Sequence, residues 1–171
     1  MKVYFAGPDV FLPNYDAFVQ KMKARAIALG LQPIFPGDTV LDGAAEIVSF
    51  NLASIRGTDL VIANLNPFRG LEPDSGTVFE CGYAVSQGKK VLAHVTDHRD
   101  LLTKLRAWPQ GPGPDSTVCS DGSQVENFGH PLNIMLSLTL SGLYQTLEQA
   151  MEAAAALGRT STAARMAETQ S

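Results

Sequence analysis

The stretch Asp59-Leu-Val-Ile-Ala-Asn-Leu65 decides the fold class of this chain. Its apolar residues are consecutive, which predicts a strand buried on both faces, as the central strands of parallel sheets are. A loop at Pro67–Pro73 and a helix at Asp74–Gly88 follow, and then a second apolar strand at Lys90–Val95. This strand–helix–strand order predicts parallel pairing, because the helix returns the chain to the edge of the sheet where the first strand began.

The N-terminal part of the chain shows the same alternation. Short strands are predicted at Lys2–Ala6 and Gln32–Phe35, and helices at Tyr15–Leu29 and Ala44–Arg56. A glycine follows each helix, as is common at helix C-termini. The whole pattern predicts an α/β domain built on a parallel sheet.

The C-terminal part gives weaker signals. Residues 96–125 are rich in proline, glycine and polar residues, which predicts a long irregular loop with a possible fifth, edge strand near Thr117–Cys119. A long helix is expected from Pro131 to Leu157. We therefore predict a single domain over residues 1–157, and a disordered tail over the small and polar residues 158–171.

Composition excludes several classes of protein. The chain has 171 residues and a net charge of −4, and a binder of nucleic-acid polymers would normally show a basic patch. Apolar stretches are too short for a signal peptide or a membrane span. Cys81 and Cys119 are far apart, and the three histidines lack ligand spacing. We expect a cytoplasmic protein with no metal and no cofactor.

Glu80 is the residue that the helical pattern does not explain. Its neighbours on the helix surface are uncharged: Gly76, Thr77, Tyr83 and Ala84. No local ion pair can therefore compensate its charge, although most of the surrounding helix is apolar. Such a carboxylate needs either a distant partner or a chemical role.

A ligand site is expected beyond the carboxyl ends of the strands, where open parallel sheets bind their ligands. The loops Ala6–Asn14 and Asn64–Asp74 and the loop after the strand at Lys90–Val95 lie there. The second of them lacks the glycine and lysine spacing of a dinucleotide or Walker loop. We expect a cleft with the side chains of Tyr4, Asp59, Asp74 and Glu80, lined also by Asp9, Asn64, Ser75 and Gly76. Paired carboxylates suit chemistry at the anomeric carbon of a sugar.

Structural roles remain open for most of these residues. Asp74 could cap the following helix, which is compatible with catalysis. Asp59 could end a turn, and Tyr4 could be a core residue. Asn133 could hold a loop by hydrogen bonds, and Arg69 is expected to be solvated.

Four segments occur in an order that resembles one known family. They are Tyr4-Phe-Ala-Gly-Pro-Asp-Val-Phe11, Asp59, Asp74-x5-Glu80-x-Gly-Tyr-Ala84 and Phe128-Gly-His-Pro-Leu-Asn-Ile-Met-Leu136. Together they resemble the nucleoside 2-deoxyribosyltransferases over about positions 1–140. The resemblance implies a flavodoxin-like, doubly wound parallel sheet of about five strands flanked by helices.

The resemblance also implies roles for individual residues. Glu80 matches the nucleophile that attacks C1′ of a 2′-deoxyribonucleoside, and Tyr4 matches the phenol that orients it. Asp59 and Asp74 match the acids that hold the base and assist its protonation. Asn133 matches a residue that reaches the 5′-hydroxyl in a neighbouring subunit, which implies a homo-oligomer with shared sites. The substrates would be 2′-deoxyribonucleosides and free purine or pyrimidine bases.

Two other functions remain open. A 2′-deoxynucleoside or 5′-phosphate N-glycoside hydrolase would use the same glutamate with water as acceptor, although the acidic first loop, Pro8–Asn14, disfavours phosphate. A nucleotide-sensing module of the same fold would bind without turnover. The apolar stretch Leu132–Leu143 exceeds what one helix stripe needs, which supports an oligomer.

Overall fold

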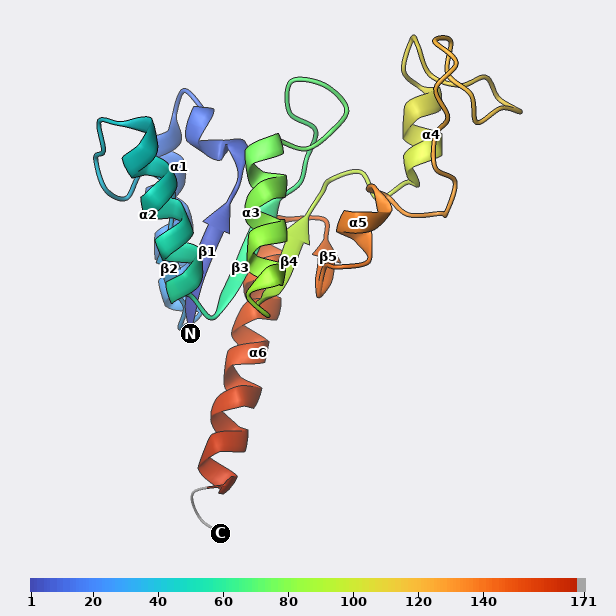
Figure 1. Cartoon of the computed structure of the whole chain (residues 1–171). Helices are drawn as coiled ribbons and strands as arrows, with labels where there is room; N and C mark the ends of the chain where they lie inside the picture. The colour runs from blue at the N-terminus through green and yellow to red at the C-terminus, as the bar shows by residue number, and fades with distance from the viewer. Residues whose placement is uncertain (169–171) are drawn as a thin grey trace.

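A single parallel sheet organises the molecule (Figure 1). The computed structural model describes the backbone of residues 1–168 and the side chains of residues 1–160. The strands are β1 (Lys2–Ala6), β2 (Gln32–Ile34), β3 (Leu60–Asn64), β4 (Lys90–His94) and β5 (Gly142–Tyr144). Their spatial order is β2-β1-β3-β4-β5, and every neighbouring pair is parallel. This is the flavodoxin order, so the predicted fold class is confirmed.

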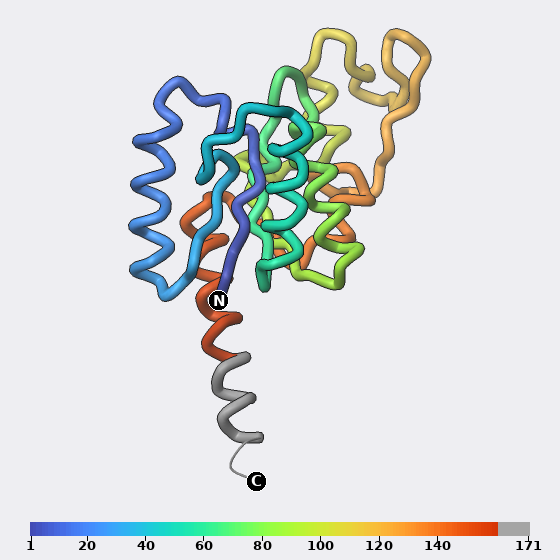
Figure 2. Tube along the Cα trace, turned by 60° about the vertical axis from the view of Figure 1, so that its left-hand side comes forward, coloured from blue at the N-terminus to red at the C-terminus, as the bar shows by residue number. Residues whose placement is uncertain are grey.

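Helices cover both faces of the sheet (Figures 1 and 2). One face is covered by α1 (Tyr15–Ala28) and α6 (Leu147–Glu168), and the other by α2 (Ala44–Gly57), α3 (Ser75–Ser86) and α5 (Ile134–Ser137). A short 3-10 helix, η1 (Pro8–Phe11), follows β1, and α4 (Leu101–Arg106) lies in the long segment after β4. We refer to the two sides as the α1/α6 face and the α2/α3 face.

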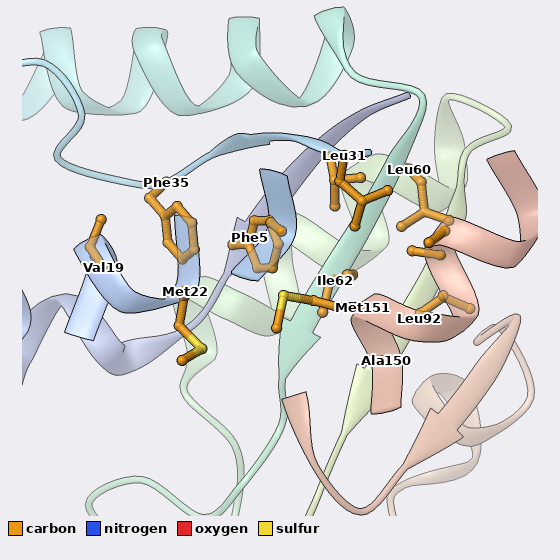
Figure 3. Close-up of a cluster of buried hydrophobic side chains, with 14 residues drawn as sticks. Phe5, Val19, Met22, Leu31, Phe35, Leu60, Ile62, Leu92, Ala150 and Met151 are labelled. Atoms are coloured by element: carbon orange, nitrogen blue, oxygen red, sulfur yellow. The ribbon is translucent and has the colours of Figure 1, made fainter. Parts of the chain in front are cut away.

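The alternation of side chains along β1 separates the two cores. Phe5 points to the α1/α6 face, where its ring stacks on Phe35 with 4.3 Å between centroids (Figure 3). Met22 of α1 and Met151 of α6 pack into the same apolar cluster. Tyr4 points the opposite way, because successive side chains of a strand alternate.

The register of the strands brings their carboxyl ends to one edge. Ala6 of β1 is paired with Ala63 of β3, and Asn64 is paired with His94 of β4. The loops that follow these strands therefore meet at the same edge of the sheet, which we call the carboxyl edge.

The prediction for the fifth strand was wrong. Val118 makes only an isolated antiparallel bridge with Gln124, whereas β5 lies inside the stretch 131–157 that was predicted as one helix. That stretch contains α5, β5 and the start of α6. Three residues are too few to show a strand period, and β5 is fixed by pairing with β4 instead, since Val95 N–H donates to the carbonyl of Tyr144 at 2.9 Å.

The helix α6 continues to Glu168, past the amino edge of the sheet (Figure 1). The structure thus has helix over residues 158–168 of the predicted disordered tail, and residues 169–171 lie outside the described part of the chain. Residues 96–133 form an arm that projects from the other end of the molecule (Figure 1). Within the described residues, no helix has the length and apolar character to cross a membrane, and no three His, Cys, Asp or Glu side chains are grouped to hold a metal ion.

Candidate active site

Glu80 has the distant partner that its helix could not supply. The hydroxyl of Tyr4, in the middle of β1, donates a hydrogen bond of 2.7 Å to Oε1 of Glu80. Tyr4 is fully buried on the α2/α3 face, and Glu80 projects toward it from α3. Two residues 76 positions apart in the sequence therefore form one unit.

Burial controls the ionisation of this pair. It raises the pKa of Glu80 to about 7, against the hydrogen bond from Tyr4, which lowers it; the negative charge of Asp74 raises it further. Burial, and next the charge of Glu80, raise the pKa of Tyr4 far above its usual range. Tyr4 therefore remains a proton donor at neutral pH, while Glu80 titrates near pH 7.

Asp74 caps the N-terminus of α3, which confirms the structural role that the sequence left open for it beside a catalytic one. Its Oδ2 accepts hydrogen bonds from the backbone N–H of Thr77 at 2.9 Å and from the Thr77 hydroxyl at 3.0 Å. Its other oxygen, Oδ1, has no hydrogen-bond partner in the described part of the chain. Ser75 and Gly76 are exposed in the first turn beside it. A Cβ at Gly76 would lie 3.1 Å from Asp74 Oδ2, so a larger residue would press on the cap.

Asp9 and Asn64 lie at the predicted edge but not with Glu80. The Nδ2 of Asn64 donates to both carboxylate oxygens of Asp9, at 3.0 and 3.1 Å. Asn64 follows Ile62 by two residues and so points to the α1/α6 face, opposite Glu80. The cavity that these residues line there is about 10 Å³, which is room for a single water and not for a base.

A polar chain that sequence analysis missed extends this contact across the carboxyl edge. Asn64 Oδ1 accepts from Asn66 Nδ2 at 2.8 Å, and Asn66 Oδ1 accepts from the backbone N–H and the hydroxyl of Thr96, both at 2.8 Å. His94 lies 3.4 Å from Asn66 Nδ2, and burial lowers its pKa. These contacts join the loops after β1, β3 and β4. Asn64 and Asn66, at the end of an apolar run, were the signal from which the sequence could have predicted this polar chain.

The placement of Asp59 in the cleft was wrong. Asp59 precedes β3 and therefore lies at the amino edge of the sheet, opposite the carboxyl edge. Its Oδ2 accepts the backbone N–H of Lys2 at 2.7 Å, which ties the starts of β1 and β3 together. The structural interpretation of this residue holds, because parallel strands put their first and last residues at opposite edges.

Asn133 organises a loop within its own chain. Its Oδ1 caps α5 by accepting from Met135 N–H at 2.9 Å, and its Nδ2 donates to Oε2 of Glu126 at 3.2 Å. The side chain is exposed and lies at the start of α5, on the α2/α3 face. Its role toward a neighbouring subunit stays a prediction.

Sequence analysis also missed an aromatic cluster at the carboxyl edge. Phe11 of η1 stacks on Phe68 of the loop after β3, with 5.6 Å between ring centroids. The guanidinium carbon of Arg69 lies 4.6 Å from the centre of the Phe68 ring and 5.1 Å from that of Phe11. The expectation that Arg69 is simply solvated missed its contacts with the two rings. These contacts join two loops that are distant in the sequence, so no local pattern predicts them. Beside the cluster is a cavity of about 420 Å³, within the usual size of small-molecule sites, lined by residues 68–75.

Comparisons with known proteins agree with this arrangement. The family model described as nucleoside 2-deoxyribosyltransferase matches residues 3–135. Among solved structures, a 2-desoxiribosyltransferase from Leishmania mexicana is 37% identical, with a TM-score of 0.77, over 90% of this chain and 96% of its own. A 2-deoxyribosyltransferase from Bacillus psychrosaccharolyticus shares the fold at 19% identity and a TM-score of 0.54, over 89% of this chain and 90% of its own. No curated protein matches the chain.

The family match covers the strand with Tyr4 and the helix with Asp74 and Glu80, so it includes the residues that form the buried pair. The resemblance inferred from the sequence is confirmed: this chain belongs to the nucleoside 2-deoxyribosyltransferase family.

Proposed function

We propose that this protein exchanges bases on 2′-deoxyribonucleosides, with Glu80 as the nucleophile. The observation that carries the proposal is the buried carboxylate of Glu80, which accepts a hydrogen bond from Tyr4. Only one oxygen of Glu80 is used in this bond, so Oε2 is available to attack. Family membership supplies the substrate class, and the buried pair supplies a group suited to attack on C1′.

In the first half of the reaction, an electron pair of Glu80 Oε2 forms a bond to C1′ of the deoxyribose. The bond between C1′ and the base nitrogen breaks, and its electron pair leaves with the base. We assign to Asp74 the role of holding the base and passing a proton to it, because Oδ1 of Asp74 has no hydrogen-bond partner among the described residues. The hydroxyl of Tyr4 keeps Oε1 of Glu80 in place, so that Oε2 faces the sugar.

In the second half, a nitrogen lone pair of an incoming base attacks C1′. The ester bond to Glu80 breaks and its carboxylate is restored. The incoming base transfers its own N–H proton to Asp74, which replaces the proton that Asp74 gave to the leaving base. Each half inverts the configuration at C1′, so the product keeps the configuration of the substrate.

We also propose that the protein works as a homo-oligomer and that Asn133 reaches the sugar in a neighbouring subunit. Large apolar side chains are exposed on the α2/α3 face and the adjoining arm: Ile47, Val48, Phe79, Phe128, Met135 and Leu138. Such a set of exposed apolar groups favours an interface. Light scattering over a dilution series gives the oligomeric state, and an activity assay at each concentration tests the role of Asn133. Full activity in a monomer would contradict the shared role.

The partners are small molecules in this proposal, and a cytoplasmic location fits the free thiols of Cys81 and Cys119. The acidic net charge supports nucleosides and bases over nucleic-acid polymers as ligands.

One assay tests the function. The protein is incubated with deoxyinosine and free adenine, and the products are separated by chromatography. Deoxyadenosine and hypoxanthine are the expected products. Free deoxyribose with hypoxanthine would instead indicate a hydrolase with water as acceptor, and binding without turnover would indicate a sensing module.

A further inference from the structure

Phe11, Phe68 and Arg69 form a unit that we call the arginine clamp. The two rings come from different loops of the carboxyl edge and are stacked within 18° of parallel. The guanidinium of Arg69 contacts both rings. Within the described residues it has no carboxylate within ion-pair distance and no hydrogen-bond acceptor, so all of its N–H groups are free to bind a ligand.

The backbone of the loop holds Arg69 in place. Its φ is 53°, in the left-handed region that few residues other than glycine adopt. The N–H of Phe68 donates to the carbonyl of Glu72 at 3.0 Å, which closes the loop on itself. Strained backbone of this kind occurs most often at functional sites. The loop therefore fixes the backbone of Arg69, and the contacts with the two rings place its guanidinium.

The clamp borders the cavity of about 420 Å³ that also contains Asp74 and Ser75. Asp74 lies six residues before Glu80 on α3, or about 9 Å along the helix axis. The cavity thus combines a cationic hydrogen-bond donor with Oδ1 of Asp74, which has no partner within the described part of the chain, at the end of the site to which we assign the base.

Charge favours a neutral ligand in this cavity over a phosphate. The carboxylates of Glu72 and Asp74 line it together with the single cation of Arg69. A phosphate would gain one attraction and meet two repulsions. A base that offers hydrogen-bond acceptors to Arg69 and donors to Asp74 fits better.

We propose that Arg69 makes 6-oxopurines, such as hypoxanthine and guanine, the preferred bases of this enzyme, with adenine as a slower acceptor. The inference rests on the proposed function of the Glu80 site. O6 and N7 of a 6-oxopurine are two acceptors on one edge, which a guanidinium binds with two hydrogen bonds. Adenine places an amino group where O6 would be, so that one pair becomes donor against donor. Pyrimidines lack the N7 edge.

A competition assay tests this selection directly. With one fixed deoxynucleoside donor, equal concentrations of hypoxanthine and adenine compete for the same deoxyribosyl-enzyme, so the ratio of early products reports acceptor choice alone. We expect hypoxanthine to be preferred by the natural protein. Arg69→Gln should lower the ratio about tenfold or more, the effect of one bidentate contact. Arg69→Lys should also lose most of the selection, because an ammonium cannot make the two-point contact.

Arg106→Gln is the matched control, because Arg106 is an exposed arginine of the arm, and it donates a hydrogen bond to the carbonyl of Ser116 at 3.2 Å. Its product ratio should equal that of the natural protein, and circular dichroism should show that all variants fold. An unchanged ratio in Arg69→Gln overturns the proposal. So does a selective loss of activity on 5′-monophosphates, which would make Arg69 a phosphate anchor.

A second measurement separates this inference from the proposed function. Calorimetry with free hypoxanthine and free adenine requires no turnover. Suppose that the natural protein exchanges no base but binds hypoxanthine more tightly than adenine, and that Arg69→Gln removes this preference. The proposed exchange reaction is then wrong, and the selection by Arg69 stands. If exchange occurs and the variant keeps the preference, the selection fails alone.

Discussion

The two faces of the sheet differ in the polarity of the side chains that they bury. On the α1/α6 face, Phe5, Ile62 and their neighbours are apolar and fill a continuous core. On the α2/α3 face, the adjacent residue Tyr4 is equally buried but donates its hydroxyl to a carboxylate. Both faces thus have an apolar core, but the α2/α3 face also keeps a costly charge beside the carboxyl edge. Substitutions one residue apart on β1 should therefore have effects of different kinds.

The largest effect is expected at Glu80. Glu80→Gln keeps the shape of the side chain but removes the attacking oxygen, so base exchange should fall by at least about 10³-fold. Assays by chromatography measure it, with Glu152→Gln as a control, since Glu152 pairs with Arg25 in an exposed site on α6. Full activity in Glu80→Gln would disprove the nucleophile.

The same variant should be more stable than the natural protein at pH 8. The folded pKa of Glu80 is raised to about 7 from 4.5, so the protonated form is favoured by folding. The stability that this provides is complete below about pH 4.5 and is lost as the pH rises through 7. Thermal unfolding at pH 5 and pH 8 should show the difference between variant and natural protein growing with pH; equal differences at both values would contradict it.

Phe5→Ala should break the other face. Loss of a buried, stacked ring should cost about 3–5 kcal/mol of unfolding free energy. Denaturant titration measures it, and Ile27→Ala is the control, because Ile27 on α1 is 63% exposed. Activity per folded molecule at low temperature should persist, because the ring faces away from Glu80. A loss of activity without a loss of stability would show that the two faces are not separate.

Tyr4→Phe should have a smaller effect, of about 10- to 100-fold on turnover, because it removes an orienting group and not the nucleophile. The hydrogen bond from Tyr4 lowers the pKa of Glu80, so its removal should move the acid limb of the pH–rate profile above the natural midpoint near pH 7. Tyr144→Phe, on the α1/α6 face, should leave the profile in place. If the acid limb of the pH–rate profile does not move in Tyr4→Phe, the hydrogen bond from Tyr4 does not lower the pKa of Glu80.

Asp59→Asn should have the smallest effect. The variant can still accept the N–H of Lys2, so we expect at most about 1 kcal/mol of lost stability and activity within about twofold of the natural protein. Steady-state kinetics with each base would check this. A large loss of activity that depends on the base would show that Asp59 takes part in base binding, in spite of its place at the amino edge.

Local sequence determined the helices and strands that frame the site. The apolar run within Asp59–Leu65 predicted a buried strand, and a helix cap was one of the two roles that the sequence left open for Asp74. Glu80 stood out because nothing within one helical turn could compensate it. These features depend on residues a few positions apart, whose spacing is set by the geometry of a helix or strand.

Tertiary structure alone decided which of these residues meet. The bond between Tyr4 and Glu80, the clamp of Phe11, Phe68 and Arg69, and the pairing of β5 with β4 all join distant segments. Such contacts depend on strand order and register, which arise from packing over the whole sheet and leave no period in the sequence.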